Sequence, residues 1–525
     1  MAFELTYATM FNPPEELHIR FEEAFAAFKK NLGTEYPILV GIEKRVCEEK
    51  FNLYSPVNTH VKLGVFQKGA TVDAQDAIAA AKAAFPAWSG KPWQERVDIL
   101  RKAADLISER VFSIAAAMTW EVGKNRMEAL GDAAETAALI KYACKQMEEN
   151  NGFIKPMGKD PLSGYDATNI SILRPYGVWL IISPFNFPSA LTGGPAGTAL
   201  VTGNTIVIKP ASDTPLSPWL LTQCFLDAGV PAGVVNFITG PGSTVGKALT
   251  ESDDVAGITF TGSYEVGMGI YRHFAQGSYV RPIIMEMGGK NPTIVSKNAN
   301  LDDAVMGLYR SAFGLQGQKC SAGSRIYVEA PVYDELVAKL AEKTRATVIG
   351  DPSRREVTMG PVINRKAYMD FQKFVGDLRE DDATILTGGT VLTEGDYANG
   401  YYCTPTIAVN VKRNHYLWKH EMFLPITFIE KVNSLDEAMQ LANDVEYGLT
   451  AGFYGSEQEA EWFFENIDAG VTYVNRPQGS TTGAWPGYQP FGGWKASGST
   501  GKQAGGLNYV QLYMREQSRT LIRKI

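Results

Sequence analysis

The feature of the sequence that most restricts its fold is an alternation of short apolar runs with segments that can form helices. Residues 177–182 and 205–208 are almost wholly apolar, and each run leads into a turn that contains proline. Continuous apolar runs of this length are typical of strands buried on both faces. Because such strands alternate with helix-compatible segments, we predict a parallel, doubly wound sheet. A second alternating set extends from Pro292 to about Asn475, which predicts an α/β fold with two doubly wound lobes.

The length of the chain and two local patterns agree with this division. A chain of 525 residues is too long for one simple hydrophobic core. Residues 72–118 are rich in Ala, Leu, Glu and Lys with apolar residues at helical spacing, which predicts a helical N-terminal region. Ser434 and Ser456 each precede a glutamate by three positions, and this spacing predicts capping boxes at two helix starts.

The charge of the chain and its apolar patterning argue against several classes of function. The net charge is −7 at pH 7 and no basic stripe is present, which argues against a general nucleic-acid or anionic-membrane binder. Residues 1–14 lack a basic stretch followed by a long apolar run, and no segment approaches the roughly 18 apolar residues of a membrane span. The cytoplasm is therefore the expected compartment.

The cysteines are odd in number and widely scattered, with no Cys-x-x-Cys pair and no histidine-rich cluster. They are Cys47, Cys144, Cys224, Cys320 and Cys403. From this pattern we expect neither a disulfide framework nor a metal site.

Cys320 and Glu286 are the strongest candidates for chemistry. Cys320 follows glycine and lysine in residues 317–321, where backbone amides and a nearby cation are expected to lower the thiol pKa from about 8.5. A cysteine that captures a substrate covalently needs a second group to release it, and Glu286, within residues 285–290, is an acid that can activate water. Taken alone, each residue is more often structural, because a free cysteine is commonly buried and a glutamate is commonly solvated or ion-paired.

Two glycine-rich turns are candidates for phosphate binding, although neither has the clean Gly-x-Gly-x-x-Gly spacing of an ordinary Rossmann fold. Residues 240–246 follow the strand-like segment 234–237 but contain one residue too many, and residues 260–267 join a predicted strand to a predicted helix. Free backbone amides at a helix start favour a phosphate group. Isolated glycine turns are nevertheless more often structural.

These segments, with others in a fixed order along the chain, resemble the aldehyde dehydrogenase superfamily over nearly the whole length. The other segments are Ser183–Pro188, Val207–Pro210, Glu421–Phe423 and Gln489–Gly493. Several motifs in one order are much more specific than any single motif. The resemblance implies a fold of two doubly wound α/β lobes with a protruding oligomerisation hairpin.

The resemblance also implies a division of the chain among three roles. The dinucleotide-binding domain is expected to comprise residues 1–155 and 176–285, and the catalytic domain residues 286–495. Residues 156–175 and 496–525 are expected to be oligomerisation elements, of which the first is the hairpin that reaches a partner subunit. The expected assembly is a homo-oligomer, a dimer or higher.

In this family the three catalytic positions correspond to Cys320, Glu286 and Asn186. Cys320 is expected to attack an aldehyde and form a thiohemiacetal, whose oxyanion accepts hydrogen bonds from the Asn186 side chain and the Cys320 backbone N–H. Loss of hydride leaves a thioester, which water activated by Glu286 is expected to hydrolyse.

NAD is the cofactor that the resemblance implies. The matching positions are Lys209 for the adenosine ribose, Gly242, Gly262, Ser263 and Val266 for the pyrophosphate, Glu421 for the nicotinamide ribose and Phe423 beside the nicotinamide. Ser212 stands where many NAD-preferring members carry an acid, which repels the 2′-phosphate of NADP. Serine removes that repulsion, so NADP is a second option.

The sequence near the nucleophile further resembles the pyrroline-5-carboxylate dehydrogenase branch of the family, which oxidises L-glutamate γ-semialdehyde to L-glutamate in proline catabolism. The substrate carboxylate would then bind the Ser321 hydroxyl and the backbone amides of Gly483 and Ala484. Phe187 and Phe491 would flank the aliphatic part of the substrate.

Two residues depart from the pattern of that branch. Trp485 occupies a place where small aliphatic residues are usual, and Leu424 replaces a common glycine. Another semialdehyde or an aromatic aldehyde therefore stays open as the substrate. A noncatalytic binding or structural protein with the same fold is a third option, although such a protein has no chemical need for Cys320, Glu286 and Asn186 together.

Overall fold

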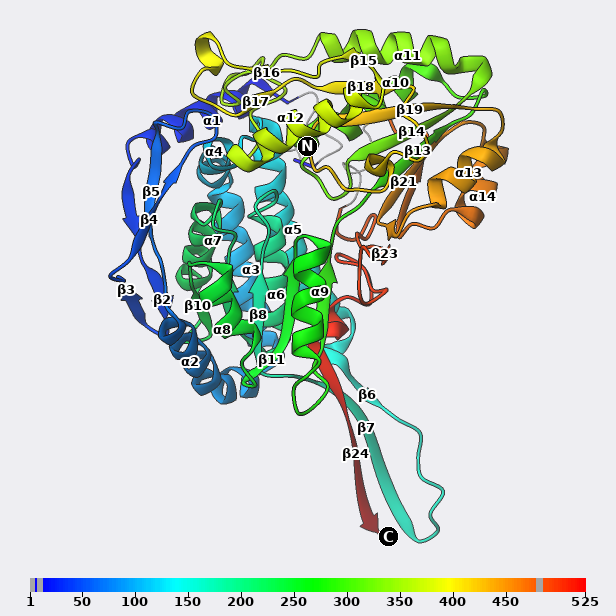
Figure 1. Cartoon of the computed structure of the whole chain (residues 1–525). Helices are drawn as coiled ribbons and strands as arrows, with labels where there is room; N and C mark the ends of the chain where they lie inside the picture. Colours follow the sequence, from blue (N-terminus) through cyan, green and yellow to red (C-terminus); the bar gives the residue numbers. More distant parts are fainter. Residues whose placement is uncertain (1–4, 7–12, 478–484) are drawn as a thin grey trace.

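The computed structural model describes residues 5–6, 13–477 and 485–525, which form two α/β lobes and a slender sheet that projects from them (Figure 1). Each lobe is built around a sheet of seven strands, so the predicted two-lobed α/β architecture is confirmed. Within the described residues, no helix combines the length and the apolar character that crossing a membrane requires.

The first sheet has a parallel centre and an antiparallel edge. Its strands, in spatial order, are β12 (Ile283–Glu286), β11 (Val255–Thr261), β8 (Val178–Ile182), β9 (Thr205–Lys209), β10 (Val235–Phe237), β2 (Ile38–Val40) and β3 (Glu43–Arg45). The first five run parallel to one another, whereas β2 and β3 are antiparallel to their neighbours. The two apolar runs that predicted buried strands are β8 and β9, and β9 is buried along its whole length.

Helices cover both faces of this sheet. They are α2 (Thr71–Gly90), α3 (Trp93–Glu109), α4 (Val111–Val122), α5 (Arg126–Glu149), α6 (Ala190–Val201), α7 (Leu216–Asp227), α8 (Lys247–Thr250) and α9 (Tyr264–Phe274). Trp179 and Ile181 of β8 lie in a core with α3 to α7, whereas Val178 and Leu180 lie in a separate core with α2 and α8. The sheet separates the two cores because successive side chains of a strand point to opposite faces. The predicted helical region at 72–118 is confirmed as α2, α3 and most of α4.

The second sheet has the same plan. Its strands, in spatial order, are β15 (Thr384–Thr387), β18 (Thr406–Val409), β19 (Ile426–Val432), β14 (Gly323–Glu329), β13 (Asn291–Val295), β21 (Thr450–Tyr454) and β22 (Val471–Val474). All neighbours are parallel except β15 and β18. The helices of this lobe are α10 (Leu301–Phe313), α11 (Ala330–Arg345), α12 (Arg365–Glu380), α13 (Leu435–Asn443) and α14 (Glu457–Asn466).

One of the two predicted capping boxes is complete. At the start of α14, Ser456 accepts a hydrogen bond from the Glu459 N–H while the Glu459 side chain accepts one from the Ser456 N–H. At the start of α13, Ser434 accepts a hydrogen bond from the Glu437 N–H. The Glu437 side chain, however, accepts its bond from the N–H of Asn433 instead of Ser434, so this second box is only half formed.

Smaller elements complete the two lobes. Helix α1 (Glu15–Lys29) packs on α4, where the Phe25 ring meets Trp120 edge-on with 5.0 Å between the ring centroids. A three-stranded sheet has the order β1 (Thr34–Tyr36), β5 (Lys62–Gln67) and β4 (Lys50–Tyr54). Two short pairs join β16 (Val391–Leu392) with β17 (Tyr402–Cys403), and β20 (Tyr447–Gly448) with β23 (Trp494–Lys495).

A three-stranded antiparallel sheet forms the projection. Its order is β24 (Met514–Lys524), β7 (Tyr165–Pro175) and β6 (Ile154–Pro156). Figure 1 shows β7 and β24 pointing away from both lobes. Beyond Met514, every residue of β24 is exposed. The predicted hairpin is therefore present, while its contact with a partner subunit stays a prediction.

The segment before β24 completes the core of the first lobe. A single turn, η6 (Val510–Tyr513), places Tyr513 against β8, where its ring centroid lies 4.6 Å from that of Trp179. Tyr513 is fully buried, and its carbonyl accepts a hydrogen bond from Asn204 Nδ2 at 2.9 Å. Residues 496–525, which we predicted as an oligomerisation element, thus also contribute to the core of a lobe.

Candidate active site

A cavity of about 540 Å³ joins the candidate cofactor turn to the candidate nucleophile. Gly262 and Ser263 from the first lobe and Cys320 from the second line the same space, together with Asn186 and Glu421. A volume of this size lies within the roughly 300–1,000 Å³ that is typical of ligand and cofactor sites. The fold therefore brings predicted site residues from distant parts of the sequence to one cavity.

Cys320 follows a short turn with an unusual backbone, η3 (Gly314–Gly317). Within this turn Leu315 and Gln316 have φ angles of 49° and 57°, in the left-handed region that non-glycine residues seldom adopt. Such residues cost about 1–3 kcal/mol each and persist only where the surroundings hold them. Here the Glu128 side chain accepts a hydrogen bond from the Leu315 N–H at 2.9 Å, and Gln316 Nε2 donates at 3.1 Å to the carbonyl of the residue that caps α4. Contacts from α4 and α5 thus fix the turn that presents the cysteine.

The surroundings of the Cys320 thiol favour its neutral form. It is partly buried, and burial, followed by the negative charges of Glu421 and Glu286, raises its pKa to about 12. From the sequence we predicted that Lys319 lowers this pKa, and that prediction is wrong. The Lys319 side chain is buried with its Nζ 3.2 Å from a carboxylate oxygen of Glu128, so its charge is already paired. The thiol therefore needs a proton acceptor when it attacks a substrate.

Ser321 contacts the candidate nucleophile. Its hydroxyl is a hydrogen-bond partner of the Cys320 sulfur, and this bond lowers the thiol pKa against the larger effect of burial. Ser321 is only 4% exposed. We predicted that this hydroxyl binds a substrate carboxylate. In the structure the Ser321 hydroxyl contacts the thiol instead. Binding of a substrate carboxylate by Ser321 therefore stays a prediction.

Glu286 is the last residue of β12. Its backbone carbonyl accepts a hydrogen bond from the Gly262 N–H at 3.1 Å, which ties it to the glycine turn of the cavity. Among the described residues, its Oε2 is buried without a hydrogen-bond partner. Burial raises the pKa of this carboxyl group to about 8, and a hydrogen bond from the Gly493 backbone opposes the shift only in part. A carboxylate with a pKa near neutral is well matched to general-base catalysis.

Asn186 lies in the loop between β8 and α6 and is 3% exposed. Its Nδ2 donates a hydrogen bond at 2.9 Å to the carbonyl of Gln318, two residues before Cys320. An asparagine amide carries two N–H groups. The second N–H can therefore donate to an oxyanion that forms beside the sulfur.

Replacement of Asn186 with alanine is expected to lower kcat by about 10²–10³ because the oxyanion loses one donor. Steady-state rates of aldehyde oxidation measure this loss. The melting temperature and the alkylation rate of Cys320 serve as controls for the fold and for the nucleophile. An unchanged kcat in the folded variant would exclude Asn186 from this role.

The turn at residues 262–263 has the strand-to-helix geometry predicted for phosphate binding. It joins β11 to α9, and Ser263 caps α9 by accepting a hydrogen bond from the Val266 N–H at 3.4 Å. A Cβ on Gly262 would lie 2.6 Å from the Phe260 ring, so glycine is required there. Gly262, Ser263 and Val266 all line the cavity at the start of α9, and the dipole of a helix favours an anion at this end.

Lys209, Ser212 and Gly242 are not among the residues that line this cavity. Lys209 ends β9, and burial lowers the pKa of its amine to about 8. A Cβ on Gly246 would lie 3.4 Å from Lys209 Cε, so the lysine packs beside the π-helical turn η2 (Gly242–Gly246). Ser212 and Gly242 are exposed. Binding of the adenosine part of a cofactor by these three residues stays a prediction.

Glu421 approaches the backbone just after Glu286. Its Oε1 accepts a hydrogen bond from the Gly289 N–H at 2.7 Å, and burial raises the pKa of its carboxyl group to about 7. A Cβ on Gly288 would clash with the Glu421 carboxylate. Gly288 is therefore needed for this approach, and a Cβ on Gly289 would clash with the Cys320 carbonyl instead.

Phe423 also lines the cavity that contains Cys320. Its φ angle is 56°, and its ring meets the Phe185 ring edge-on with 5.7 Å between centroids. We did not predict Phe185 as a site residue, although it stands within the motif Ser183–Pro188.

The aromatic residues predicted to flank the substrate contact other parts of the protein. Phe187 packs with Trp485 in a small apolar cluster, and Lys124 Nζ lies 3.7 Å from the centroid of its ring. Phe491 is partly buried and exchanges backbone hydrogen bonds of 2.9 and 2.8 Å with Ala504. Neither phenylalanine lines the cavity of Cys320. Gly483 and Ala484, the predicted carboxylate-binding amides, lie outside the described residues.

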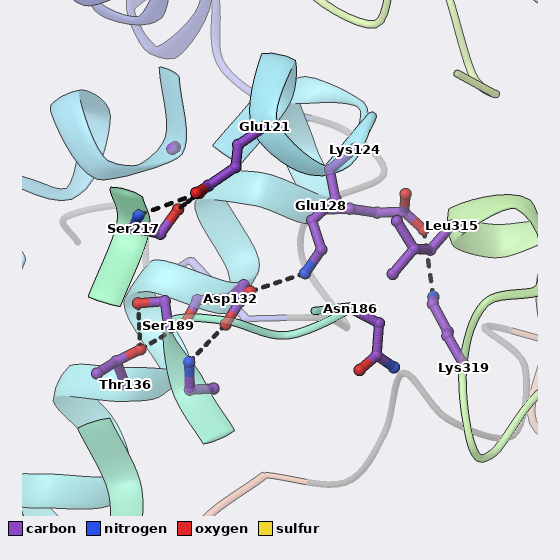
Figure 2. Close-up of polar contacts among 12 residues, drawn as sticks. Glu121, Lys124, Glu128, Asp132, Thr136, Asn186, Ser189, Ser217, Leu315 and Lys319 are labelled. Atoms are coloured by element: carbon purple, nitrogen blue, oxygen red, sulfur yellow. Dashed lines mark hydrogen bonds and ion pairs between the residues drawn. The ribbon is translucent and has the colours of Figure 1, made fainter. Parts of the chain in front are cut away.

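The structure adds two buried acids that we did not predict, Glu128 and Asp132 (Figure 2). Both project from α5 toward the segments that carry Cys320 and Asn186. No motif marks them.

The sequence model of the aldehyde dehydrogenase family matches residues 43–518, about nine-tenths of the chain. The chain belongs to the aldehyde dehydrogenase family. The matched range contains all three candidate catalytic residues of this aldehyde dehydrogenase and the strands of both seven-stranded sheets from β3 onward. The predicted family is therefore confirmed.

Similar proteins cover nearly all of this aldehyde dehydrogenase. The 1-pyrroline-5-carboxylate dehydrogenase 1 of Halalkalibacterium halodurans is 37% identical over 503 residues, which are 95% of each chain. The crystal structure of a 1-pyrroline-5-carboxylate dehydrogenase from Thermus with bound NAD has a TM-score of 0.91 at 31% identity, over 98% of both chains. Proline utilization A from Bdellovibrio bacteriovorus has a TM-score of 0.90 at 33% identity, over 96% of this chain and 52% of that one. The chain thus spans about half the length of this last protein, and the predicted fold is confirmed.

Proposed function

We propose that this aldehyde dehydrogenase oxidises L-glutamate γ-semialdehyde, the open form of 1-pyrroline-5-carboxylate, to L-glutamate in proline catabolism, with NAD as the oxidant. The observation that carries the proposal is one cavity that joins a strand-to-helix turn to the Cys320 thiol and the Asn186 amide. Glu286 lies close enough for its charge to raise the thiol pKa. The choice of substrate is supported by the similar proteins that are named 1-pyrroline-5-carboxylate dehydrogenase.

The residues of the cavity fit a dinucleotide. The start of α9, with Gly262 and Ser263, suits a diphosphate because the dipole of the helix favours negative charge at this end. The Glu421 carboxylate suits ribose hydroxyl groups, and the Phe423 ring offers an apolar surface beside Cys320. When bound, the oxidised nicotinamide accepts a hydride.

The residues of the chain account for the remaining steps. The Cys320 sulfur attacks the carbonyl carbon and loses its proton, which Glu286 and Glu421, with pKa values of about 8 and 7, are suited to accept. The Asn186 amide and the Cys320 N–H hold the oxyanion. Departure of the hydride leaves a thioester on Cys320. Deprotonated Glu286 then takes a proton from water, the water oxygen attacks the thioester, and glutamate leaves as the sulfur recovers a proton.

A second cavity, of about 380 Å³, supports a substrate that carries a carboxylate. It adjoins the turn of Cys320, because Gly314 and Lys319 line it. Its charged lining residues are the anion Glu128 and five cations, Arg126, Arg310, Lys319, Lys343 and Arg355. Lys319 is ion-paired with Glu128, Arg126 with Glu22, and Arg355 with Glu15 and Glu22. The five cations outnumber the three acids paired with them, and an excess of positive charge raises the local concentration of an anionic ligand.

The substrate is tested by the initial rate of NAD reduction with L-pyrroline-5-carboxylate, beside pentanal, which has the same chain length without the amino-acid end. The expected result is a clear preference in kcat/KM for the amino-acid aldehyde, and no rate in the Cys320→Ala variant. Preference for pentanal would contradict the proposed substrate and keep the aldehyde dehydrogenase reaction.

Ser212 is proposed to permit the use of NADP. Replacement of Ser212 with glutamate is expected to raise the ratio of NAD to NADP efficiency by about tenfold, since one close like-charge pair contributes about 1–4 kcal/mol between water and a protein surface. The measurement is kcat/KM for both cofactors in both proteins. Because Ser212 is exposed, the melting temperature should stay unchanged. An unaltered ratio would show that Ser212 does not face the 2′-position.

An aromatic aldehyde is the second candidate substrate, because Trp485 packs with Phe187 in a cluster beside α5. A higher kcat/KM for benzaldehyde than for L-pyrroline-5-carboxylate in the same assay would favour it. We further propose a cytoplasmic homo-oligomer. The free state of all five cysteines agrees with a reducing compartment, and the exposed faces of β24 agree with a subunit contact.

A further inference from the structure

Two buried acids on one helix hold the two segments that carry the candidate oxyanion donor and nucleophile (Figure 2). Glu128 and Asp132 lie four residues apart in α5, so they occupy one face of the helix about one turn apart. Asp132 is fully buried and Glu128 is 8% exposed. Neither lines the cavity that contains Cys320 and Asn186, although Glu128 lines the second cavity, and the chemical steps of the proposed reaction use neither acid.

Asp132 fixes the start of α6, just after Asn186. Its Oδ1 accepts a hydrogen bond from the Ala190 N–H at 2.7 Å, and a carboxylate at this end of a helix is also favoured by the helix dipole. One turn further along α5, the Thr136 hydroxyl shares a hydrogen bond of 2.7 Å with Ser189. Two adjacent residues of the Asn186 segment are thereby tied to α5.

Close packing leaves α6 little room to move relative to α5. A Cβ on Gly194 would lie 2.7 Å from Leu139 Cδ1, and one on Gly193 would overlap the methyl group of Thr136. Only glycine allows this approach. Because packed interiors contain few voids, the contact with α5 determines where the first turn of α6 lies.

Lys124 completes the contact on this side. Its Nζ lies 2.7 Å from Asp132 Oδ2, and both side chains are fully buried. The same Nζ lies 3.7 Å from the centroid of the Phe187 ring, a cation–π contact with the residue that follows Asn186. Asp132 thus holds the Asn186 loop through Ala190 and, by way of Lys124, through Phe187.

Glu128 has the corresponding contacts on the side of the nucleophile. Its Oε1 accepts hydrogen bonds from the Leu315 N–H at 2.9 Å and from Lys319 Nζ at 3.2 Å. Leu315 lies in the left-handed turn, and Lys319 directly precedes Cys320. Glu128 is itself held by Asn125, whose Nδ2 donates to Oε2 at 3.1 Å.

We propose that Asp132 and Glu128 are positioning residues that use α5 as a common frame, Asp132 to place the Asn186 amide and Glu128 to place the Cys320 sulfur. The inference rests on the proposed function, because the frame matters only if both groups act on one aldehyde. A displacement of about 1 Å between reacting groups costs on the order of 10²-fold in rate. The loss should fall on kcat, since neither acid binds the cofactor.

A double-mutant cycle tests the Asp132 half. Asp132→Ala is expected to lower kcat on the order of 10²-fold with little change in the KM for NAD. In an Asn186→Ala background the same change is expected to cost less than about threefold, because residues that act through one another are not additive. If the two losses multiply instead, Asp132 does not act through Asn186 and the proposal is overturned.

A charge-matched variant separates positioning from misfolding, because Asp132→Ala leaves the buried Lys124 cation unpaired. Asp132→Asn combined with Lys124→Met removes both buried charges and keeps an oxygen that can accept from the Ala190 N–H. This variant is expected to fold and to retain kcat within about tenfold of wild type, since the tie to α6 survives. A folded variant that loses as much kcat as Asn186→Ala would overturn the proposal.

The rate of Cys320 alkylation by iodoacetamide, measured against pH, tests the Glu128 half. Glu128→Ala with Lys319→Met removes the acceptor for Leu315 without leaving a buried charge, and its matched control is Glu128→Gln with Lys319→Met, which keeps an acceptor. The alanine pair is expected to shift the pH profile of alkylation, whereas the glutamine pair and the Asp132 variants leave it unchanged. Identical profiles for the two pairs would overturn the proposal.

The double-mutant cycle of Asp132 and Asn186 is measured with whichever aldehyde the wild-type protein oxidises fastest. A preference for another aldehyde therefore contradicts the proposed substrate and leaves the test of the frame intact.

Discussion

Replacement of Cys320 with alanine is expected to abolish aldehyde oxidation, with a loss in kcat on the order of 10⁴–10⁶, as follows the removal of a covalent nucleophile. Without the sulfur no thiohemiacetal forms, and the aldehyde carbon lacks the adjacent oxyanion from which a hydride leaves readily. The loss is measured as the rate of NAD reduction at saturating L-pyrroline-5-carboxylate, with binding of NAD checked separately by fluorescence.

Cys47 offers a matched control for this substitution. It is the other partly buried cysteine, burial raises its thiol pKa to about 11, and it lies outside the cavity. Cys47→Ala should keep wild-type turnover, and iodoacetamide should inactivate it as it inactivates the wild type. In Cys320→Ala, iodoacetamide should alkylate no thiol in the cavity. Turnover near the wild-type rate in Cys320→Ala would mean that the protein oxidises aldehydes without covalent capture.

Replacement of Glu286 with glutamine is expected to separate the two halves of the reaction. The first turnover should still release a burst of NADH, because Glu421 remains as an acceptor for the thiol proton. Steady turnover should fall by about 10²–10⁴, since the thioester no longer has a base to activate water. Rapid-mixing measurement of NADH formation records both phases, and mass spectrometry of the quenched protein should detect the acyl group on Cys320. Two intact phases would show that another residue performs the hydrolysis.

The pH dependence of the same reaction gives an independent check. The raised pKa of Glu286, about 8, means that the carboxyl group is largely protonated and inactive as a base below that pH. Steady turnover of the wild type should therefore rise as the pH increases through about 8. The glutamine variant should lose this rise, because the group that titrates is gone. A rise that persists in the variant would assign the titration to a different group.

The fold could be predicted where the sequence pattern is local. The runs at 177–182 and 205–208 are continuous apolar segments, and they became the central strands β8 and β9. The antiparallel edge made by β2 and β3 could not be predicted, because these strands are only three residues long and one of them is polar. The return of Tyr513 to the core also depends on a pairing between distant residues that no local pattern encodes.

The candidate site shows the same limit. Cys320, Asn186 and Glu421 were predicted from motifs and do line one cavity. The expected effect of Lys319 on the thiol was wrong, because its ion pair with Glu128 joins residues 191 positions apart. From the sequence, Glu128 is indistinguishable from an ordinary acid in the first turn of a helix. Its burial and its bond to a left-handed turn follow from the packing of the lobes, which residue type alone does not reveal.

The burial of Tyr513 against β8 also sets an order in time. Tyr513 is made 334 residues after its partner Trp179 (513 − 179). At roughly 5–20 residues per second, a ribosome takes about 20–70 s to make the intervening chain. During that interval the apolar face of β8 that Tyr513 will cover stays uncovered. The whole second lobe is synthesised before Tyr513 can cover this face. The first lobe of this protein is therefore begun first and finished last, and its dependence on chaperones should be greatest while the second lobe is being made.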